Sequence, residues 1–174
     1  FNRNTKLSLS IGLLLLFPTL VQGADSLYDQ QIQQARQGQY APFLSYLQQY
    51  QLRHALTPSQ VADWLQVALW AGQDDEVVKV WRRYQVYMPI PARGTAAAAQ
   101  ALRNQKQWQT SLTLWQQALS QAPGSDDYRI GYIKTLADAR KDGEALSEAR
   151  RLVAEQASIA HLQTLSYVYL RLGK

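Results

Sequence analysis

The side chains most capable of acid–base chemistry in this sequence are a few carboxylates, and their positions argue against catalysis. They are Asp63, the run Asp74, Asp75 and Glu76, and the pair Asp126 and Asp127. A general acid–base mechanism needs two titratable groups facing one another in a cleft. These acids fall instead at expected helix starts, turns and exposed faces, where carboxylates commonly stabilise the positive end of a helix. We therefore predict that the chain is not an enzyme and has no catalytic residue.

The residues that could hold a metal or a cofactor are equally sparse. The sequence has no cysteine, which excludes disulfides, thiolate zinc sites and a cysteine nucleophile. Its two histidines, His54 and His161, are too far apart in sequence to form a local metal motif. We expect both to be surface or helix-end residues. No metal site and no cofactor are predicted.

A second set of polar side chains is suited to binding rather than to reaction. If the chain is a helical-repeat superhelix, the first helix of each repeat lines its concave surface. The side chains there that lie off the packing stripe combine both charges, amides and one indole, which suits a polar polymer or a protein loop. They are Asp63, Gln66, Trp70, Arg93, Gln100, Arg103, Asn104, Lys134 and Asp138.

The elements that must position these side chains follow from an internal repeat. When the sequence is laid over itself with Gly38 on Gly72, Trp81 falls on Trp115 and Pro89 on Pro123. The blocks are 24–57, 58–91, 92–125 and 126–159, and a partial fifth begins near residue 160. A period of 34 is that of the tetratricopeptide repeat (TPR), a helix–turn–helix unit. We predict an all-α TPR superhelix, an α-solenoid of antiparallel helix pairs.

Helix boundaries agree with this period. Thr57, Pro58 and Gln60 form the pattern of an N-cap, a first-turn proline and a capping box. Gly72 stands where the first helix of its block should end, and Ser125 should cap a further helix. No stretch alternates as strands do, which excludes an α/β fold.

The abundant aromatic residues are better explained by the core than by a sugar site. Trp81, Trp108 and Trp115 occupy large-residue positions of the repeat, and Trp64 lies on the apolar face of its helix. We predict that these four are core residues. Trp70 lies off that stripe and is expected to be accessible.

Residues 1–23 have the layout of a secretory signal peptide. Arg3 and Lys6 precede the apolar run 7–17, and Gly23 offers a cleavage point. That run is too short for a transmembrane helix, which needs about 20 apolar residues. We expect residues 24–174 to act outside the cytoplasm. The net charge of +5 is scattered and forms no basic stripe, so we predict no nucleic-acid partner.

Four segments go beyond a general TPR pattern. They are residues 62–74, 91–94, 108–120 and 135–139. Together they resemble the N-terminal region of the outer-membrane exporters of poly-β-1,6-N-acetyl-D-glucosamine (PNAG), the PgaA/HmsH type of biofilm porin. The similarity covers about residues 25–174. It implies that the chain is the N-terminal part of a longer protein, with a signal peptide, a periplasmic TPR superhelix and its own C-terminal β-barrel in the outer membrane.

The resemblance also implies partners. In such exporters the TPR region is thought to dock a periplasmic polysaccharide deacetylase and to guide cationic, partly deacetylated polysaccharide to the pore. On charge, Asp63 and Asp138 are expected to attract the polymer, whereas Arg93 and Arg103 suit an acidic protein surface. The alternative is a periplasmic peptide- or protein-binding TPR adaptor without polysaccharide contact. Block 126–159 departs from the pattern at residues 140–142, where the turn lacks glycine.

Overall fold

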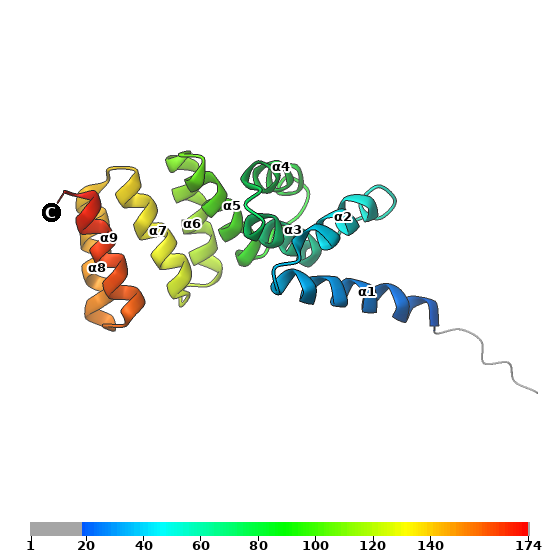
Figure 1. The fold of residues 1–174 in the computed structure, drawn as a ribbon. Coiled ribbons are helices and arrows are strands. Elements are labelled where there is room, and N and C mark those ends of the chain that lie inside the picture. Colours follow the sequence, from blue (N-terminus) through cyan, green and yellow to red (C-terminus); the bar gives the residue numbers. More distant parts are fainter. Residues whose placement is uncertain (1–18, 174) are drawn as a thin grey trace, which may run out of the picture.

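The computed structural model describes residues 19–173, with side chains from residue 27, and in that part the chain forms nine helices and no strand (Figure 1). The predicted all-α class is therefore confirmed. The helices are α1 (Thr19–Arg36), α2 (Tyr40–Tyr50), α3 (Pro58–Trp70), α4 (Asp74–Tyr84), α5 (Ala92–Asn104), α6 (Trp108–Gln121), α7 (Asp126–Asp138), α8 (Asp142–Glu155) and α9 (Ile159–Arg171).

The predicted signal peptide lies mostly outside the described residues. Residues 1–18 carry its charged and apolar parts, and nothing is described there. Helix α1 begins at Thr19 and runs through the predicted cleavage point at Gly23. Cleavage after Gly23 stays a prediction.

The turns between paired helices share one backbone conformation, which recurs at the period of the repeat. At four positions, each one repeat after the last, the backbone has a positive φ: Gly38 (94°), Gly72 (71°), Lys106 (60°) and Arg140 (60°). This left-handed conformation ends one helix and starts its partner, and glycine adopts it without steric cost. Two repeats use glycine as expected, while the other two place a long cationic side chain there.

The starts of the first helices follow the predicted caps. The Thr57 hydroxyl accepts from the backbone N–H of Gln60, and the Gln60 side chain accepts from the backbone N–H of Thr57, which completes a capping box. Ser125 caps α7 and Ser158 caps α9 through the hydroxyl alone, which accepts from the backbone N–H of Tyr128 and of His161 respectively. Ser158 comes one residue earlier than the period requires, and this is where the repeat slips.

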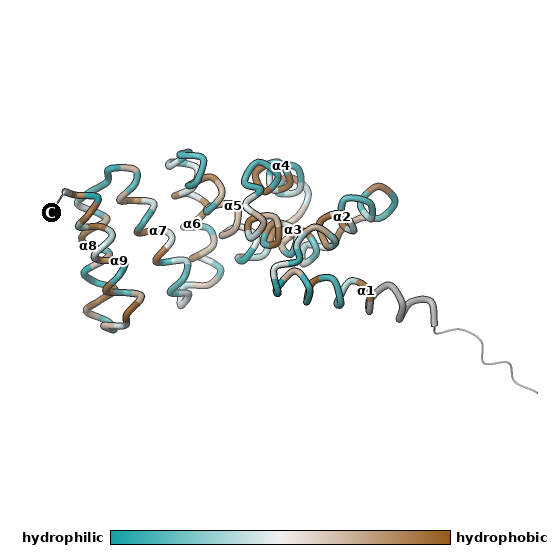
Figure 2. The backbone as a smooth tube through the Cα atoms, in the orientation of Figure 1, coloured by the Kyte–Doolittle hydropathy of each residue, from teal (hydrophilic) through white to brown (hydrophobic). Residues whose placement is uncertain are grey.

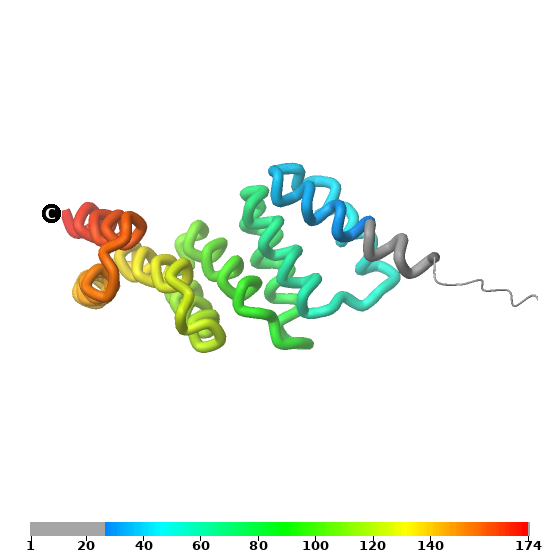
Figure 3. The backbone as a smooth tube through the Cα atoms, turned by 90° about the horizontal axis from the view of Figure 1, so that it is seen from below, coloured from blue at the N-terminus to red at the C-terminus, as the bar shows by residue number. Residues whose placement is uncertain are grey.

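The helices form two layers. Helices α1, α3, α5, α7 and α9 are the inner layer, in which consecutive members contact one another. Helices α2, α4, α6 and α8 are the outer layer, and the backbones of these four stand further apart than those of the inner helices. Because the inner helices are the more closely spaced, the solenoid curves toward them. Seen from below, the helices follow one another in chain order from one end of the molecule to the other (Figure 3).

Small residues set the spacing of the layers. Helix α5 buries alanines at 96, 97, 98, 99 and 101, which lets its neighbours approach closely. The Ser111 hydroxyl of α6 donates to the carbonyl of Ala99 at 2.7 Å. A Cβ atom on Gly94 would stand 2.8 Å from the Ile90 side chain and 3.0 Å from the Ala62 backbone.

Apolar and polar residues are mixed along the coloured part of each helix (Figure 2). One core cluster extends from α1 to α6 and a second from α6 to α9. Among the described residues, no helix has the length and apolar character that a membrane crossing requires.

The tryptophans divide unequally between core and surface. Trp64 and Trp115 are buried as predicted, at 1% and 5% exposure, and Trp70 is accessible as predicted, at 43%. Trp81 is half-buried against the core. The prediction that Trp108 is a core residue is wrong: it is only half-buried, because it begins α6 beside the solvent-facing turn at Lys106.

Trp115 joins the two core clusters by entering α7 at a glycine. A Cβ atom on Gly131 would overlap the Trp115 ring. The indole Nε1 donates to the Thr135 hydroxyl at 3.0 Å, and that hydroxyl donates to the Gly131 carbonyl at 2.7 Å. The ring therefore occupies the space that any other residue at 131 would need.

We expect Gly131→Ala to lower the free energy of unfolding by about 1–3 kcal/mol, as overpacking does in other cores. Alanine favours helix by about 1 kcal/mol over glycine, but the clash with the Trp115 ring outweighs this gain. Urea denaturation measures the change. The control is Gly143→Ala in α8, where a Cβ atom meets nothing within 4 Å and stability should hold or rise. Equal behaviour of the two variants would contradict the close packing at Gly131.

Candidate partner-binding face

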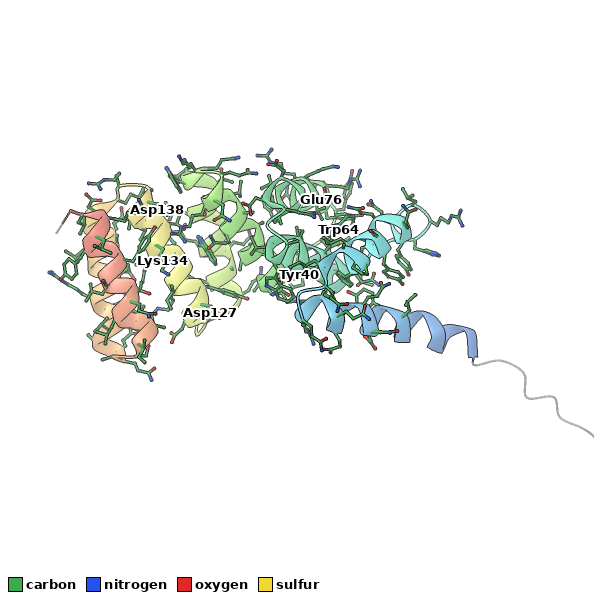
Figure 4. The ribbon with its side chains drawn as sticks, in the orientation of Figure 1. Tyr40, Trp64, Glu76, Asp127, Lys134 and Asp138 are labelled. Atoms are coloured by element: carbon green, nitrogen blue, oxygen red, sulfur yellow. The ribbon has the colours of Figure 1, made fainter. Side chains whose placement is uncertain are left out.

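All nine residues proposed from the sequence as a binding face lie on the inner layer. Asp63, Gln66 and Trp70 belong to α3; Arg93, Gln100, Arg103 and Asn104 belong to α5; Lys134 and Asp138 belong to α7. Figure 4 shows Asp138 and Lys134 along α7, with Asp127 at the opposite end of that helix. The side chains do not form one site but two ionic clusters and a polar link.

The first cluster joins α1, α3 and α5 around the Asp63 carboxylate. Tyr28 of α1 donates its hydroxyl to Asp63 Oδ2. Arg93 of α5 donates to Asp63 Oδ1 at 2.9 Å and to the Ser59 hydroxyl and carbonyl at 2.9 and 3.0 Å. Burial, and next the hydrogen bond to Asp63, raise the pKa of the Tyr28 phenol, so that phenol stays a donor throughout the physiological range.

The second cluster joins α5, α7 and α9 around the Asp138 carboxylate, which is only 6% exposed. Arg103 of α5 donates to its Oδ2 at 2.7 Å, and Arg171 of α9 forms an ion pair with its Oδ1, at 3.0 Å from Nε. Tyr167 of α9 donates its hydroxyl to the same Oδ1 and accepts from Arg103 at 2.9 Å. Three consecutive inner helices are thus held by one carboxylate.

Three cations of this second cluster lie around the Tyr167 ring. The guanidinium carbons of Arg103 and Arg171 lie 5.6 and 5.3 Å from the ring centroid, and Lys134 Nζ lies 5.5 Å from it. A cation at such a distance is attracted by the electron-rich face of the ring. The cluster therefore keeps three cations close together with a single carboxylate.

These contacts bear on one expectation drawn from the sequence, which stays a prediction: that Asp63 and Asp138 attract a cationic polymer while Arg93 and Arg103 repel it. In the structure the four residues pair with each other, Asp63 with Arg93 and Asp138 with Arg103. A paired charge presents little net field to a ligand, because the two potentials cancel beyond a few ångström. The sequence could not show this pairing, since the partners are 30 and 35 residues apart.

Four proposed residues lie outside the two ionic clusters. Gln100 and Asn104 form a polar link, and Gln66 and Trp70 are not part of it. Gln100 donates to Asn104 at 2.8 Å, and Asn104 donates to Asp74 of α4 at 3.1 Å. Gln66 is half-buried and Trp70 is 43% exposed. Trp70, the one aromatic residue among the nine, therefore offers an accessible ring.

Four residues of the clusters were not proposed from the sequence: Tyr28, Ser59, Tyr167 and Arg171. The repeat itself could have found two of them. With the one-residue slip before α9, Tyr167 occupies the position of Gln66, Gln100 and Lys134 in earlier repeats. Arg171 then occupies the position of Trp70, Asn104 and Asp138. If the inner-face positions of the earlier repeats had been applied to α9 with this one-residue shift, Tyr167 and Arg171 would both have been predicted on the inner face.

The two histidines differ in their surroundings. His54 is exposed, as expected. His161 is a helix-end residue, as expected, but it is buried rather than on the surface, at 3% exposure in the first turn of α9. Its Nδ1 lies 2.5 Å from the Gln156 carbonyl, and its Nε2 lies 2.8 Å from the Asp126 carboxylate of α7. Since both ring nitrogens face acceptors, the doubly protonated ring fits best. The Gln156 carbonyl, and after it Asp126, raise the pKa of His161.

This geometry predicts that the chain loses stability as the pH rises above the unfolded histidine pKa of 6.5 and through the higher pKa of folded His161. A histidine whose pKa is raised by folding stabilises the fold fully below the unfolded pKa of 6.5. That contribution is lost as the pH rises through the folded pKa. Thermal melts across this range should show the midpoint falling with pH in the wild type and changing less in His161→Gln. An equal slope in both proteins would contradict the assignment.

The described residues hold no group of three or more His, Cys, Asp or Glu side chains arranged to bind a metal ion. The inner face offers hydrogen-bond donors and acceptors, paired charges and an accessible indole. This arrangement can bind and orient a polar partner.

The fold and the polar inner face define the class of protein: an all-α helical-repeat solenoid with a polar inner layer. Over 166 residues the chain is 43% identical to the poly-β-1,6-N-acetyl-D-glucosamine export protein of Escherichia coli strain K12, and it matches that of Escherichia coli O157:H7 equally. The match covers 95% of this chain and 20% of each relative, so the chain spans about a fifth of their length. The resemblance inferred from the sequence is confirmed to that extent. No family model matches the chain, and no solved structure does.

Proposed function

We propose that this chain is a scaffold segment of a polysaccharide exporter, placed in the periplasm, whose inner face contacts the export machinery. The observation that carries the proposal is the 43% identity to PNAG export proteins over 95% of the chain. In finer detail, the segment docks a periplasmic polysaccharide deacetylase, guides partly deacetylated polymer toward the pore, or does both.

The inner face supports a scaffold role in two ways. Its ionic clusters tie α1 to α3 and α5, and α5 to α7 and α9, which stiffens the layer that a partner would meet. Trp70 leaves an indole accessible beside Gln66 on the same helix. A flat apolar ring next to an amide suits either a sugar ring or a protein side chain.

Location in the periplasm rests on the leader-like residues 1–23 and on the relatives. Cleavage after Gly23 would release residues 24–174 there as part of a longer outer-membrane protein. N-terminal sequencing of the exported protein tests this step separately from the binding role.

The decisive experiment uses a bacterium whose exporter carries this segment. We expect Trp70→Ala combined with Gln66→Ala to reduce secreted polymer, measured by immunoblot, and to reduce co-purification of the deacetylase. The matched control is Tyr87→Ala, an aromatic residue that is 79% exposed in the loop between α4 and α5, away from the inner face. It should leave both readouts unchanged.

The two readouts also separate the alternatives. Loss of deacetylase capture with normal polymer binding favours a protein-binding adaptor without polysaccharide contact. Normal secretion by an exporter from which residues 58–159 have been deleted would overturn the scaffold proposal, since the segment would then be dispensable.

A further inference from the structure

A basic hollow opens at the edge of the solenoid where the inner helices end. It has a volume of about 400 Å³ and is lined by Lys106, Trp108, Ala137, Asp138, Arg140, Leu170 and Arg171. These residues come from the α5–α6 turn with the start of α6, the α7–α8 turn with the end of α7, and the end of α9. Figure 1 shows the three segments along the upper edge of the molecule. We call this cavity the basic hollow.

The charge that faces the basic hollow is positive. Three cations line it, Lys106, Arg140 and Arg171, against one carboxylate, Asp138. Asp138 is 6% exposed, and Arg103 and Arg171 already neutralise it. Among the described residues Lys106 has no ion-pair partner. Arg140 donates to the Arg171 carbonyl and holds Asp142 at 3.0 Å, but its side chain is 63% exposed. The four cations Lys106, Arg140, Arg171 and Arg103 outnumber the carboxylates Asp138 and Asp142, so the cavity keeps a net positive charge.

Two of these cations stand at a backbone conformation that favours glycine. Lys106 and Arg140 both have φ of 60°, at the turn position where Gly38 and Gly72 stand in the earlier repeats. For a residue with a Cβ atom this conformation costs about 1–2 kcal/mol, and for glycine it does not. Residues held at such a cost commonly serve function. Here both of them line the same cavity.

The equivalent turn one repeat earlier has the opposite charge. The hollow beside the α3–α4 turn is lined by Gly72, Gln73, Asp74, Asp75, Glu76 and Gln105. The same edge is thus acidic at α4 and basic from α6 to α9. Of these two hollows, the basic one combines cations with an indole, that of Trp108, and with a strongly exposed leucine, Leu170, at 73%.

We propose that the basic hollow binds a carboxylate-bearing segment of a partner protein. Lys106, Arg140 and Arg171 would receive an Asp or Glu side chain, while Trp108 and Leu170 contact an apolar residue beside it. This inference rests on the proposed function and deepens it, because it identifies the partner class that meets this edge. A partly deacetylated glucosamine polymer carries ammonium groups, which these cations repel.

Two other anionic classes fit the hollow less well. A nucleic acid needs a run of basic residues along its phosphates, and three cations around one cavity supply no such track. A phosphate group alone would leave Leu170 and Trp108 without a contact. An acidic residue next to an apolar one satisfies both parts of the lining.

The test uses the purified chain and a short fluorescent peptide of alternating Glu and Leu. Fluorescence anisotropy should show binding that weakens as salt is raised, because salt screens exposed charges. Lys106→Gly with Arg140→Gly should weaken binding by about tenfold, since two exposed charge contacts are lost. The melting temperature of this variant should not fall, because glycine suits both turns. Affinity would then fall without any loss of the fold.

The matched control is Arg53→Gln with Lys79→Gln, which removes the same charge from α4 and from the loop between α2 and α3. It should bind the peptide as the wild type does. The proposal is overturned if this control loses as much affinity as the glycine variant, if the glycine variant binds normally, or if a Lys–Leu peptide binds equally well. Stronger binding to inorganic phosphate or to phosphatidylglycerol vesicles than to the peptide would also overturn it.

The peptide assay tests the basic hollow and the secretion assay tests the export role, so a negative result in one does not decide the other. Absence of peptide binding, with secretion still dependent on Trp70, refutes the basic hollow and leaves the scaffold role standing. Peptide binding that requires Lys106 and Arg140, with secretion unaffected by deletion of residues 58–159, refutes the export role and leaves a protein-binding site.

Discussion

Replacing Trp115 with alanine is expected to lower the free energy of unfolding by about 3–5 kcal/mol, the range found for large-to-small changes in cores. The ring is 5% exposed and belongs to the cluster that extends from α1 to α6. It also enters α7 at Gly131 and packs near Tyr128, with ring centroids 6.3 Å apart. Alanine would leave a cavity between α6 and α7 and would remove the hydrogen bond that the Thr135 hydroxyl accepts.

Chemical denaturation of the purified chain measures this effect. The control is Gln117→Ala on the same helix, whose side chain is exposed, and it should change stability by less than about 0.5 kcal/mol. Trp115→Phe should fall between the two, because it keeps most of the ring and loses the hydrogen bond to Thr135. A Trp115→Ala variant within about 1 kcal/mol of the wild type would show that the two core clusters are not joined through this ring.

Replacing Asp138 with alanine is expected to cost about 2–4 kcal/mol, somewhat less than the loss of one member of a fully buried ion pair. Such a loss leaves the partner charged and unpaired, which costs about 3–5 kcal/mol when both are fully buried. Arg103 is 15% exposed and suffers most of this cost. Arg171 is 54% exposed, so water replaces part of what it loses and the expected value is reduced.

Asp127→Ala is the control for Asp138→Ala, since Asp127 lies on the same helix and is exposed (Figure 4). It should cost less than about 1 kcal/mol, the size of a helix-dipole contribution. The double variant of Asp138→Ala with Arg103→Met should be more stable than Asp138→Ala alone, because the uncompensated cation is then removed. If it is not, the Arg103–Asp138 pair contributes little to holding α5 against α7.

The ion pairs also change how charge reversals on the inner face should be interpreted. A substitution such as Asp138→Lys would place a third cation against Arg103 and Arg171 and disturb the packing of three helices. Its effect on a ligand could not be separated from its effect on the fold. Trp70, Gln66, Lys106 and Arg140 are better probes, because none of them holds two inner helices together through an ion pair.

The helical class and the repeat could be predicted because they depend on local chemistry. The regular spacing of Gly38 and Gly72, the cap at Thr57 and the cap at Ser125 act within a single turn of chain, and the backbone follows them. Burial of Trp64 and Trp115 followed from their repeat positions. The sequence also determined that the candidate binding residues lie on one layer, since position within a repeat decides the layer.

Tertiary structure alone decided which of those residues face each other. The partners of Asp63 and Asp138 lie in neighbouring repeats, and only the packing angle between helices brings Arg93, Arg103 and Arg171 to them. Burial of His161 against Asp126 and the meeting of Lys106, Arg140 and Arg171 around one hollow have the same origin. A repeat period specifies the position of each side chain on its own helix, whereas the net charge of a surface depends on distances between helices of different repeats.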